Sequence, residues 1–232
     1  MLKKTVVIHQ PDFMPHLGFF HRLLQCDLYI VLDHVQFSKG GWHNRDKIKT
    51  PEGVKWLTLP VRLTGRSFSP IHEVRLNNDL NWRENHLKQI KRCYKDSSSF
   101  DEIFSELRSL YEFTGDRMAD FNMKVLNWLM EKFDAKVNTV LSTTLRASGA
   151  SNEMLVDLLT KVGATNYLSG IGARSYYKPE PFEQAGIRVL WQDFSHPMYP
   201  QRYGEFIPYL SSLDVLFNCG VQQSRDILRS CL

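Results

Sequence analysis

The chain has 232 residues, of which 43% are hydrophobic and 23% charged, and its net charge is +4. These values are ordinary for a globular protein with a sizeable core, and the small positive charge suits anionic ligands better than nucleic acid. The four cysteines are isolated and no run approaches the roughly 20 apolar residues that cross a bilayer, so we expect no disulfide framework, zinc site or membrane span.

The first half of the chain predicts strands joined by short connections. Residues 4–9 are expected to form the first strand because they contain the β-branched run TVVI. The same run is too short for the apolar region of a secretory signal, so we expect a cytoplasmic protein. A helix follows around 16–25 and a second strand over 28–33, which implies a right-handed parallel crossover. Residues 54–61 and 71–76 predict a hairpin or meander.

Helical periodicity dominates the middle of the chain, and alternation then returns. Helices are expected over 81–94, 99–113 and 116–133, as a helical insertion at about 79–134 that caps the sheet. Strands and helices then alternate to the end, over 137–142, 151–162, 165–169, a short helix ending near Gly186, 187–192, 211–219 and 222–230. We therefore predict a single α/β domain, 1–232, with a mostly parallel Rossmann-like sheet covered by helices on both faces.

Polar residues follow each of the first two strands, where open α/β sheets bind ligands. His9, Gln10 and Asp12 follow the first strand, and Asp33, His34 and Gln36 follow the second. His9 or His34 is a candidate general base, oriented by a carboxylate such as Asp33, while Gln10, Asp12 and Gln36 are candidate substrate ligands. The alternative is that His9 is only hydrogen-bonded within its turn.

Residues 9–21 also invite comparison with nucleotidyltransferases, whose His-x-Gly-His turn binds nucleotide phosphates after the first strand. Here His16 and Gly18 are followed by Phe19, and His21 comes two residues late. The missing second histidine weakens that interpretation. His16 and His21 are otherwise ordinary polar residues of the following helix.

Three loops supply further candidate ligands. The loop after Gly40 and Gly41 offers an indole for stacking and a guanidinium for phosphate, although the arginine could instead pair with a surface acid. The segment 167–177 has two of the three glycines of a dinucleotide fingerprint, so that fingerprint fails. A loop stiffened by two prolines follows residue 192. The candidates are Lys39, Trp42, His43, Asn44, Arg45, Ser169, Arg174, His196, Tyr199 and Gln201. No spacing indicates a metal site, and Cys219 would be a nucleophile only beside a base.

Three passages together resemble the WbqC-like protein family. They are VVIHQPDFMPHLGFFHRLLQCDLYIVLDHVQFSKGGWHNRDKI, WLTLPV, and YLSGIGARSYY through FIPYLSSLDVLFNCG. The specific parts are the block at 10–20, with Gln10, Pro11, Pro15 and Gly18, and the Asp-x-Val-Gln-Phe block at 33–37. The resemblance implies a place in bacterial surface-polysaccharide biosynthesis, beside enzymes that make nucleotide-linked amino sugars. It supplies no catalytic assignment.

The leading hypothesis is a transferase that acylates or aminoacylates the amine of a nucleotide-linked sugar. His9 or His34 would remove the proton, Asp33 would orient the imidazole, and Arg45, Lys39 and Arg174 would hold phosphates. The donor would be a carrier-protein or coenzyme A thioester, with no tightly bound cofactor. The alternatives are a nucleotidyltransferase or ATP-dependent ligase, and a non-catalytic partner that presents a sugar or carrier protein to another enzyme.

Overall fold

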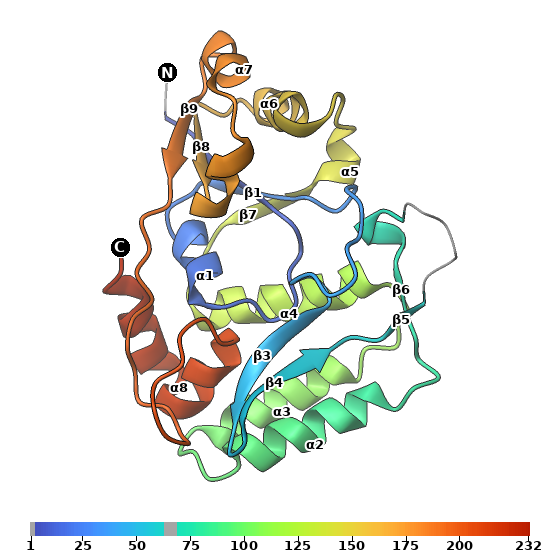
Figure 1. Ribbon diagram of the computed structural model, residues 1–232, viewed down its shortest axis with the longest axis vertical. Helices are drawn as coiled ribbons and strands as arrows, with labels where there is room; N and C mark the ends of the chain where they lie inside the picture. Colours follow the sequence, from blue (N-terminus) through green and yellow to red (C-terminus); the bar gives the residue numbers. More distant parts are fainter. Residues whose placement is uncertain (1–2, 63–68) are drawn as a thin grey trace.

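A five-stranded parallel sheet forms the centre of the computed structural model, which describes residues 3–62 and 69–232 (Figure 1). The strand order is β7-β2-β1-β8-β9. The strands are β1 (Thr5–His9), β2 (Leu28–Val31), β7 (Asn138–Leu141), β8 (Asn166–Ser169) and β9 (Arg188–Trp191). The prediction of a mostly parallel Rossmann-like sheet is confirmed.

Helices cover both faces of the sheet because successive side chains of a strand face opposite sides. Val7, Tyr29 and Val31 join the core on the face covered by α1 (Leu17–Leu23), α4 (Met118–Lys132) and α8 (Ser212–Arg229). Val6, Ile8 and Ile30 join the core on the face covered by α6 (Ser151–Lys161) and α7 (Pro179–Gln184). Continuous apolar strands are what a sheet buried on both sides requires.

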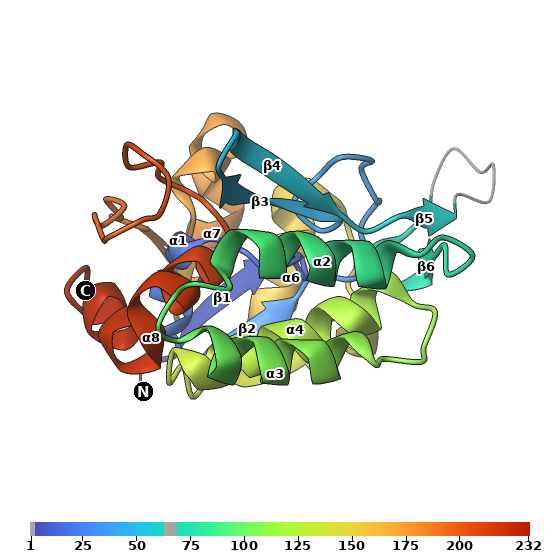
Figure 2. The ribbon, with the colours of Figure 1, turned by 90° about the horizontal axis from the view of Figure 1, so that it is seen from below.

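Between β2 and β7 the chain adds the predicted helices together with two small antiparallel sheets. The helices are α2 (Trp82–Tyr94), α3 (Phe100–Tyr111) and α4, and they share the core of the first face. The sheets pair β3 (Arg45–Thr50) with β4 (Gly53–Thr58), and β5 (Val61–Arg62) with β6 (Arg75–Leu76). Figure 2 shows α2 between the β3–β4 hairpin and α3.

Sequence periodicity misjudged two segments of this insertion. Strand β3 was not predicted, because the charged residues Asp46 and Lys49 are buried in it and conceal its apolar pattern. The strand expected over 71–76 is a 3₁₀ turn, Ile71–Glu73, followed by the short β6. Its backbone donates to the carbonyl groups of Val35 and Asp33 instead of entering a ladder. The polar stretch at 63–68, expected as a connection, lies outside the described residues.

Two short helical segments and a kinked helix complete the fold. The helix α5 (Ser142–Leu145) begins directly after β7, and a 3₁₀ segment, Ile171–Tyr176, follows β8. Gly220, at φ 75° and ψ 171°, interrupts α8, so the two predicted tail helices are confirmed as two segments around a kink. Across the described ranges, 3–62 and 69–232, no helix has the length and apolarity needed to span a bilayer.

The strand order creates a crevice beside β1. From β1 the chain moves through α1 to β2 on one side, and later returns to β8 on the other side. The ladder between β1 and β8 joins only Thr5 with Asn166 and Val6 with Tyr167, whereas β1 pairs with β2 at four positions. Open sheets bind ligands at such a reversal, beyond the carboxyl ends of the strands.

Candidate functional site

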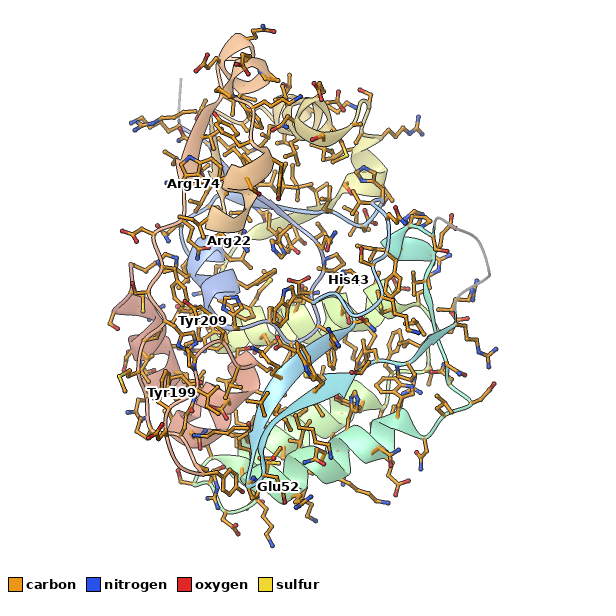
Figure 3. The ribbon with its side chains drawn as sticks, in the orientation of Figure 1. Arg22, His43, Glu52, Arg174, Tyr199 and Tyr209 are labelled. Atoms are coloured by element: carbon orange, nitrogen blue, oxygen red, sulfur yellow. The ribbon has the colours of Figure 1, made fainter. Side chains whose placement is uncertain are left out.

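A cleft of about 590 Å³ opens at the reversal between β1 and β8. Its walls come from β1 and α1, from β8 and the 3₁₀ segment after it, and from the chain that follows β9. Among its lining residues are His9, His16, Arg22, Tyr167, Ser169, Gly170, Gly172, Tyr176, Gln192 and Tyr209. In Figure 3, Arg22 lies on α1 with Tyr209 near this helix, and the labelled His43 lies farther toward the insertion.

Arg22 is a buried cation without a protein partner. All seven residues of α1 are buried, and Arg22 is only 8% exposed. Its Nε is buried and unbonded, and within the described part of the chain no hydrogen bond or ion pair involves this guanidinium. Burial lowers the pKa of Arg22 from its ordinary value. An unpaired buried charge is costly, so this guanidinium is suited to an anionic ligand in the cleft.

Gly170 allows the loop after β8 to approach that guanidinium closely. A Cβ at this position would lie 3.1 Å from Nη1 of Arg22, closer than an unshifted side chain permits. At Gly172 a Cβ would meet nothing within 4 Å. The two glycines predicted to favour an anion therefore border the cleft, although the arginine beside them comes from α1.

His16 is fixed as a neutral hydrogen-bond donor at the rim of the same cleft. It is the N-cap of α1, and its Nδ1 accepts the Gly18 N–H at 3.0 Å. The proton of the neutral ring is therefore on Nε2. Burial lowers the pKa of His16 to about 4, and nearby His196 adds to the effect. The Tyr209 ring packs edge-on against His16 at 5.4 Å.

His9 and Asp12 form an acid–base pair at the end of β1. His9 Nδ1 donates to the Gln10 carbonyl at 3.1 Å and lies 3.5 Å from Oδ2 of Asp12. Burial, assisted by Arg22, lowers the pKa of His9 to about 3. Burial raises the pKa of Asp12 to about 7, against the opposing effect of Arg22. Asp12 therefore titrates where a general base is useful, and His9 does not.

Two smaller hollows adjoin the cleft, and His9 lines both. The first, of about 150 Å³, is the inner hollow; it also contains Asp12, His16, Arg22, Trp42 and Asp46. The second, of about 340 Å³, lies against α6, and beside His9 it is lined by the apolar or aromatic side chains of Ile8, Leu32, Met154, Leu155, Tyr167 and Tyr176 and by the polar Gln10 and Ser151. The structure thus brings together His9, Gln10, Asp12, Trp42 and Ser169 from the predicted set.

Asp33 and His34 lie outside this group. The Asp33 carboxylate accepts hydrogen bonds from the Ser142 and Thr143 hydroxyls, each at 2.8 Å, and from the Thr143 N–H at 3.0 Å. His34 Nδ1 contacts the Ser142 hydroxyl at 2.6 Å. Asp33 therefore reaches His34 only through Ser142, and it makes no contact with His9 among the described residues. Its carboxylate holds the start of α5.

The loop residues 36–45 mostly stabilise their own loop. His43 Nε2 donates to the Ser38 carbonyl at 2.8 Å, and Asn44 Oδ1 accepts the Gly40 N–H at 3.1 Å. Arg45 Nε donates to the Gly40 carbonyl at 2.8 Å, and the guanidinium stacks on Trp56 at 4.2 Å. Gln36 and Lys39 are exposed and line none of the three hollows.

The later predicted ligands support the cleft wall from outside. Arg174 stacks over Trp191 at 5.2 Å, and His196 packs against Tyr209 at 5.0 Å. Tyr199 donates to Asp214 at 3.0 Å, and Gln201 Oε1 accepts from Lys49 at 3.2 Å. None of these four predicted residues lines the three hollows.

Sequence reasoning missed Arg22, Asp46 and Gln192. Gln192 lines the cleft and donates to the Gly18 carbonyl at 2.7 Å. Arg22 had one sequence signal: it lies in LGFFHRLL, a short and mostly apolar helix between two buried strands. Asp46 had no such signal in the sequence.

Cys219 lies outside the cleft, and burial raises the pKa of its thiol to about 11. No group of three His, Cys, Asp or Glu side chains in the described residues is placed to hold a metal ion.

Comparison with known proteins adds the family. A sequence model of the WbqC-like protein family matches residues 10–226. The chain is also 33% identical over 230 residues to Uncharacterized protein Rv1507c of Mycobacterium tuberculosis, covering 98% of this chain and 99% of that one. No solved structure matches the chain. The matched range contains His16, Arg22 and Asp46 and begins one residue after His9.

Replacing Arg22 by methionine separates a ligand-binding role from a structural one. Arg22→Met should leave the free energy of unfolding of the ligand-free protein unchanged or raise it by about 1–4 kcal/mol, because a lone buried charge is removed. Calorimetric titration should show nucleoside diphosphate affinity reduced by about 100-fold or more. Arg188→Met, at an exposed position of β9, is the matched control. A marked loss of stability with normal nucleotide binding would contradict the assignment.

Replacing Asp33 should affect stability rather than binding. Asp33→Ala orphans the donors of the buried Ser142 and the half-buried Thr143, and we expect the free energy of unfolding to fall by about 3 kcal/mol. Asp33→Asn keeps one acceptor oxygen and should lose less. Denaturant unfolding measures both, and nucleotide affinity of the folded fraction should match the wild type. Weaker nucleotide binding by a stable Asp33→Asn protein would contradict this prediction and show that Asp33 takes part in ligand binding.

Proposed function

The chain belongs to the WbqC-like protein family, and we propose that it is a transferase that acylates or aminoacylates the amine of a nucleotide-linked sugar in bacterial surface-polysaccharide biosynthesis. The observation that carries the proposal is the buried, unpaired guanidinium of Arg22 at the strand reversal. A diphosphate supplies the missing negative charge, and the adjoining acid–base pair acts on an amine. The family resemblance supports the sugar context.

The nucleotide's diphosphate would lie between Arg22 and the loop after β8. The guanidinium forms a charge-assisted, bidentate contact with phosphate oxygens. His16, the N-cap of the helix that carries Arg22, has an Nε2–H that donates a second contact, and Gly170 lets the loop backbone approach the guanidinium closely. Tyr209 and Tyr176, which are 43% and 60% exposed, are available at the mouth of the cleft.

The reaction would join an amine nitrogen to a thioester carbonyl carbon. The nitrogen attacks the carbonyl, the C–N bond forms, and the C–S bond breaks. Asp12 accepts the proton lost by the amine and returns it to the departing thiolate, which leaves as a thiol. His9, neutral and held by the Gln10 carbonyl, positions the Asp12 carboxyl beside it. Asp12 thus takes the role that sequence reasoning gave to His9 and His34.

The hollow against α6 is suited to the donor's acyl group. Six apolar or aromatic side chains line it beside three polar ones, and it meets the cleft at His9 and Tyr176. A carrier-protein or coenzyme A thioester would place its acyl group there and its carbonyl near His9. The two substrates would then approach the acid–base pair from different directions.

Nucleotidyl transfer is the second candidate function, and one observation favours it. His16 stands at the start of α1, directly after the central strand, where a nucleotidyltransferase phosphate turn would lie. His21, however, does not line the cleft, and its Nε2 donates to the Cys231 carbonyl at 2.9 Å. The second histidine of such a turn is therefore engaged elsewhere.

Incubation with nucleotide-linked amino sugars and acyl thioesters tests the transferase. Mass spectrometry should detect an N-acylated or N-aminoacylated sugar nucleotide with the wild type, and at least about 100-fold less with Arg22→Met. The same nucleotides carrying a hydroxyl in place of the amine are the matched control and should give no amide. Absence of product with every amino sugar and thioester tested would contradict acyl transfer. Pyrophosphate release with nucleoside triphosphates would instead support nucleotidyl transfer.

The pH dependence of the reaction tests the role of Asp12. Its pKa is raised to about 7, and only the carboxylate accepts a proton. We therefore expect kcat/KM to rise about tenfold per pH unit below pH 7 and to level off above it. Asp12→Asn should lack this limb and lose about 100-fold or more in kcat. A limb at higher pH that both proteins share belongs to the sugar amine, and an unchanged limb near pH 7 in Asp12→Asn would refute the assignment.

A further inference from the structure

The inner hollow beside the main cleft is too small for a whole ligand. Its volume is about 150 Å³, whereas sites that enclose a complete small molecule occupy roughly 300–1,000 Å³. It shares His9, His16 and Arg22 with the main cleft. It can therefore hold one ring of a ligand whose remaining part lies in the cleft.

Asp46 is a buried acid on the wall of this hollow, and among the described residues no cation lies within ion-pair distance of it, although the charge of nearby Lys47 acts on it. It lies on β3, is 2% exposed, and faces Leu57 across the β3–β4 ladder. Its Oδ1 accepts the N–H of the adjacent Lys47 at 2.6 Å, and in the described part of the chain no other hydrogen bond or ion pair involves its carboxyl. Burial raises the pKa of Asp46 well above its ordinary value, and nearby Asp12 adds to that effect. A ligand that donates hydrogen bonds or carries positive charge would compensate for the burial of this carboxyl group.

Trp42 offers the inner hollow a flat apolar face. The indole is 46% exposed, packs against Trp56 at a ring distance of 5.7 Å, and has Lys47 Nζ 5.5 Å from its ring centre. These neighbours keep the ring in place without covering it. Sugar rings have apolar C–H faces and polar hydroxyl edges, so an indole face beside buried carboxyls and a guanidinium suits a sugar ring.

The order of charges along the cleft matches the order of charges in the substrate. Arg22 lines both the main cleft and the inner hollow, whereas Asp12 and Asp46 line only the inner hollow of these two. A nucleotide-linked amino sugar has an anionic diphosphate followed by a ring with a cationic amine. With the diphosphate at Arg22, the ring extends toward Trp42 and the amine toward the two acids.

We propose that the inner hollow binds the sugar ring of the acceptor, and that Asp46 receives its amino group and selects it over a hydroxyl. This inference rests on the proposed function and deepens it. Asp46 holds the protonated amine on arrival and accepts the proton that the ammonium must lose before it attacks, and this proton then passes to solvent. Asp12, next to His9, accepts the second proton, which the nitrogen loses as the C–N bond forms, and passes it to the thiolate. A sugar with a hydroxyl at the same ring position cannot form a charge-assisted hydrogen bond with Asp46, so this sugar should bind more weakly than the amino sugar.

Calorimetric titration with matched pairs of sugars tests this selection. The probes are dTDP- and UDP-linked hexoses with an amine at C2, C3 or C4, each paired with the hydroxyl analogue, and the nucleoside diphosphates alone. The wild type should bind at least one amino sugar about tenfold or more tightly than its partner. Asp46→Asn should reduce that preference below about twofold and leave nucleoside diphosphate affinity unchanged. Trp42→Ala should weaken both members of the pair equally, and Lys55→Gln, exposed on β4, is the control.

The outcomes distinguish this inference from the function on which it rests. An amine preference that persists in Asp46→Asn, or a wild type without any preference, overturns the inference while nucleotide binding at Arg22 still supports the transferase. A wild type that binds neither the nucleoside diphosphates nor the sugars overturns the proposed function itself. If Asp46→Asn fails to fold, the wild-type comparison of the matched pairs still decides.

Discussion

A single buried cation determines how the cleft is organised. Arg22 lies on a seven-residue helix whose every residue is buried, because α1 is wedged between the sheet and α8. The guanidinium lines the cleft, and nothing in the described chain forms an ion pair with it. Burying a charge without a close partner is costly, and although nearby Tyr167 and Asp12 favour the charged form, an anionic ligand in the cleft would offset this cost further. The open strand ends and the glycine loop lie directly beside this group.

The same burial sets the protonation of the groups around Arg22. His9 and His16 have lowered pKa values and are neutral, so they do not compete with Arg22 for an anion. Burial raises the pKa of Asp12 to about 7, so its proton is exchangeable near neutrality, and burial also raises the pKa of Asp46 well above its ordinary value. One low-dielectric pocket thus supplies a fixed cation, two neutral imidazoles and two carboxyls with raised pKa values. That combination suits a substrate with an anionic portion and a basic portion.

The fold was predictable because its signals are local, and the charges of the site were not. The β-branched run of β1 and the apolar faces of α2, α3 and α4 determine their own structure, so periodicity was sufficient. Asp33 shows the limit: a carboxylate at a strand end predicts a ligand site equally well whether it faces the cleft beside β1 or, as here, binds Ser142, 109 residues away, and lines a separate hollow of about 340 Å³. Arg22 and Asp46 look like solvated charges in the sequence, since their burial depends on elements packed from elsewhere. His9, Asp12 and Ser169 were proposed from the ends of β1 and β8, and Trp42 from its flat indole face, and all four line the cleft or the hollows beside it.

The acidic half of the site distinguishes the two candidate chemistries. Phosphate binding by Arg22 and His16 would serve nucleotidyl transfer and acyl transfer equally, so neither residue discriminates between them. Nucleotidyl transfer releases pyrophosphate and places its charge-stabilising cations around the reacting phosphorus. Here the groups that line the inner hollow with Arg22 include two carboxyls and two neutral imidazoles, and the second histidine of the turn is bound to the Cys231 carbonyl. Carboxyls with raised pKa values are poor neighbours for an attacked phosphate and good acceptors for an ammonium proton, and this favours chemistry at an amine.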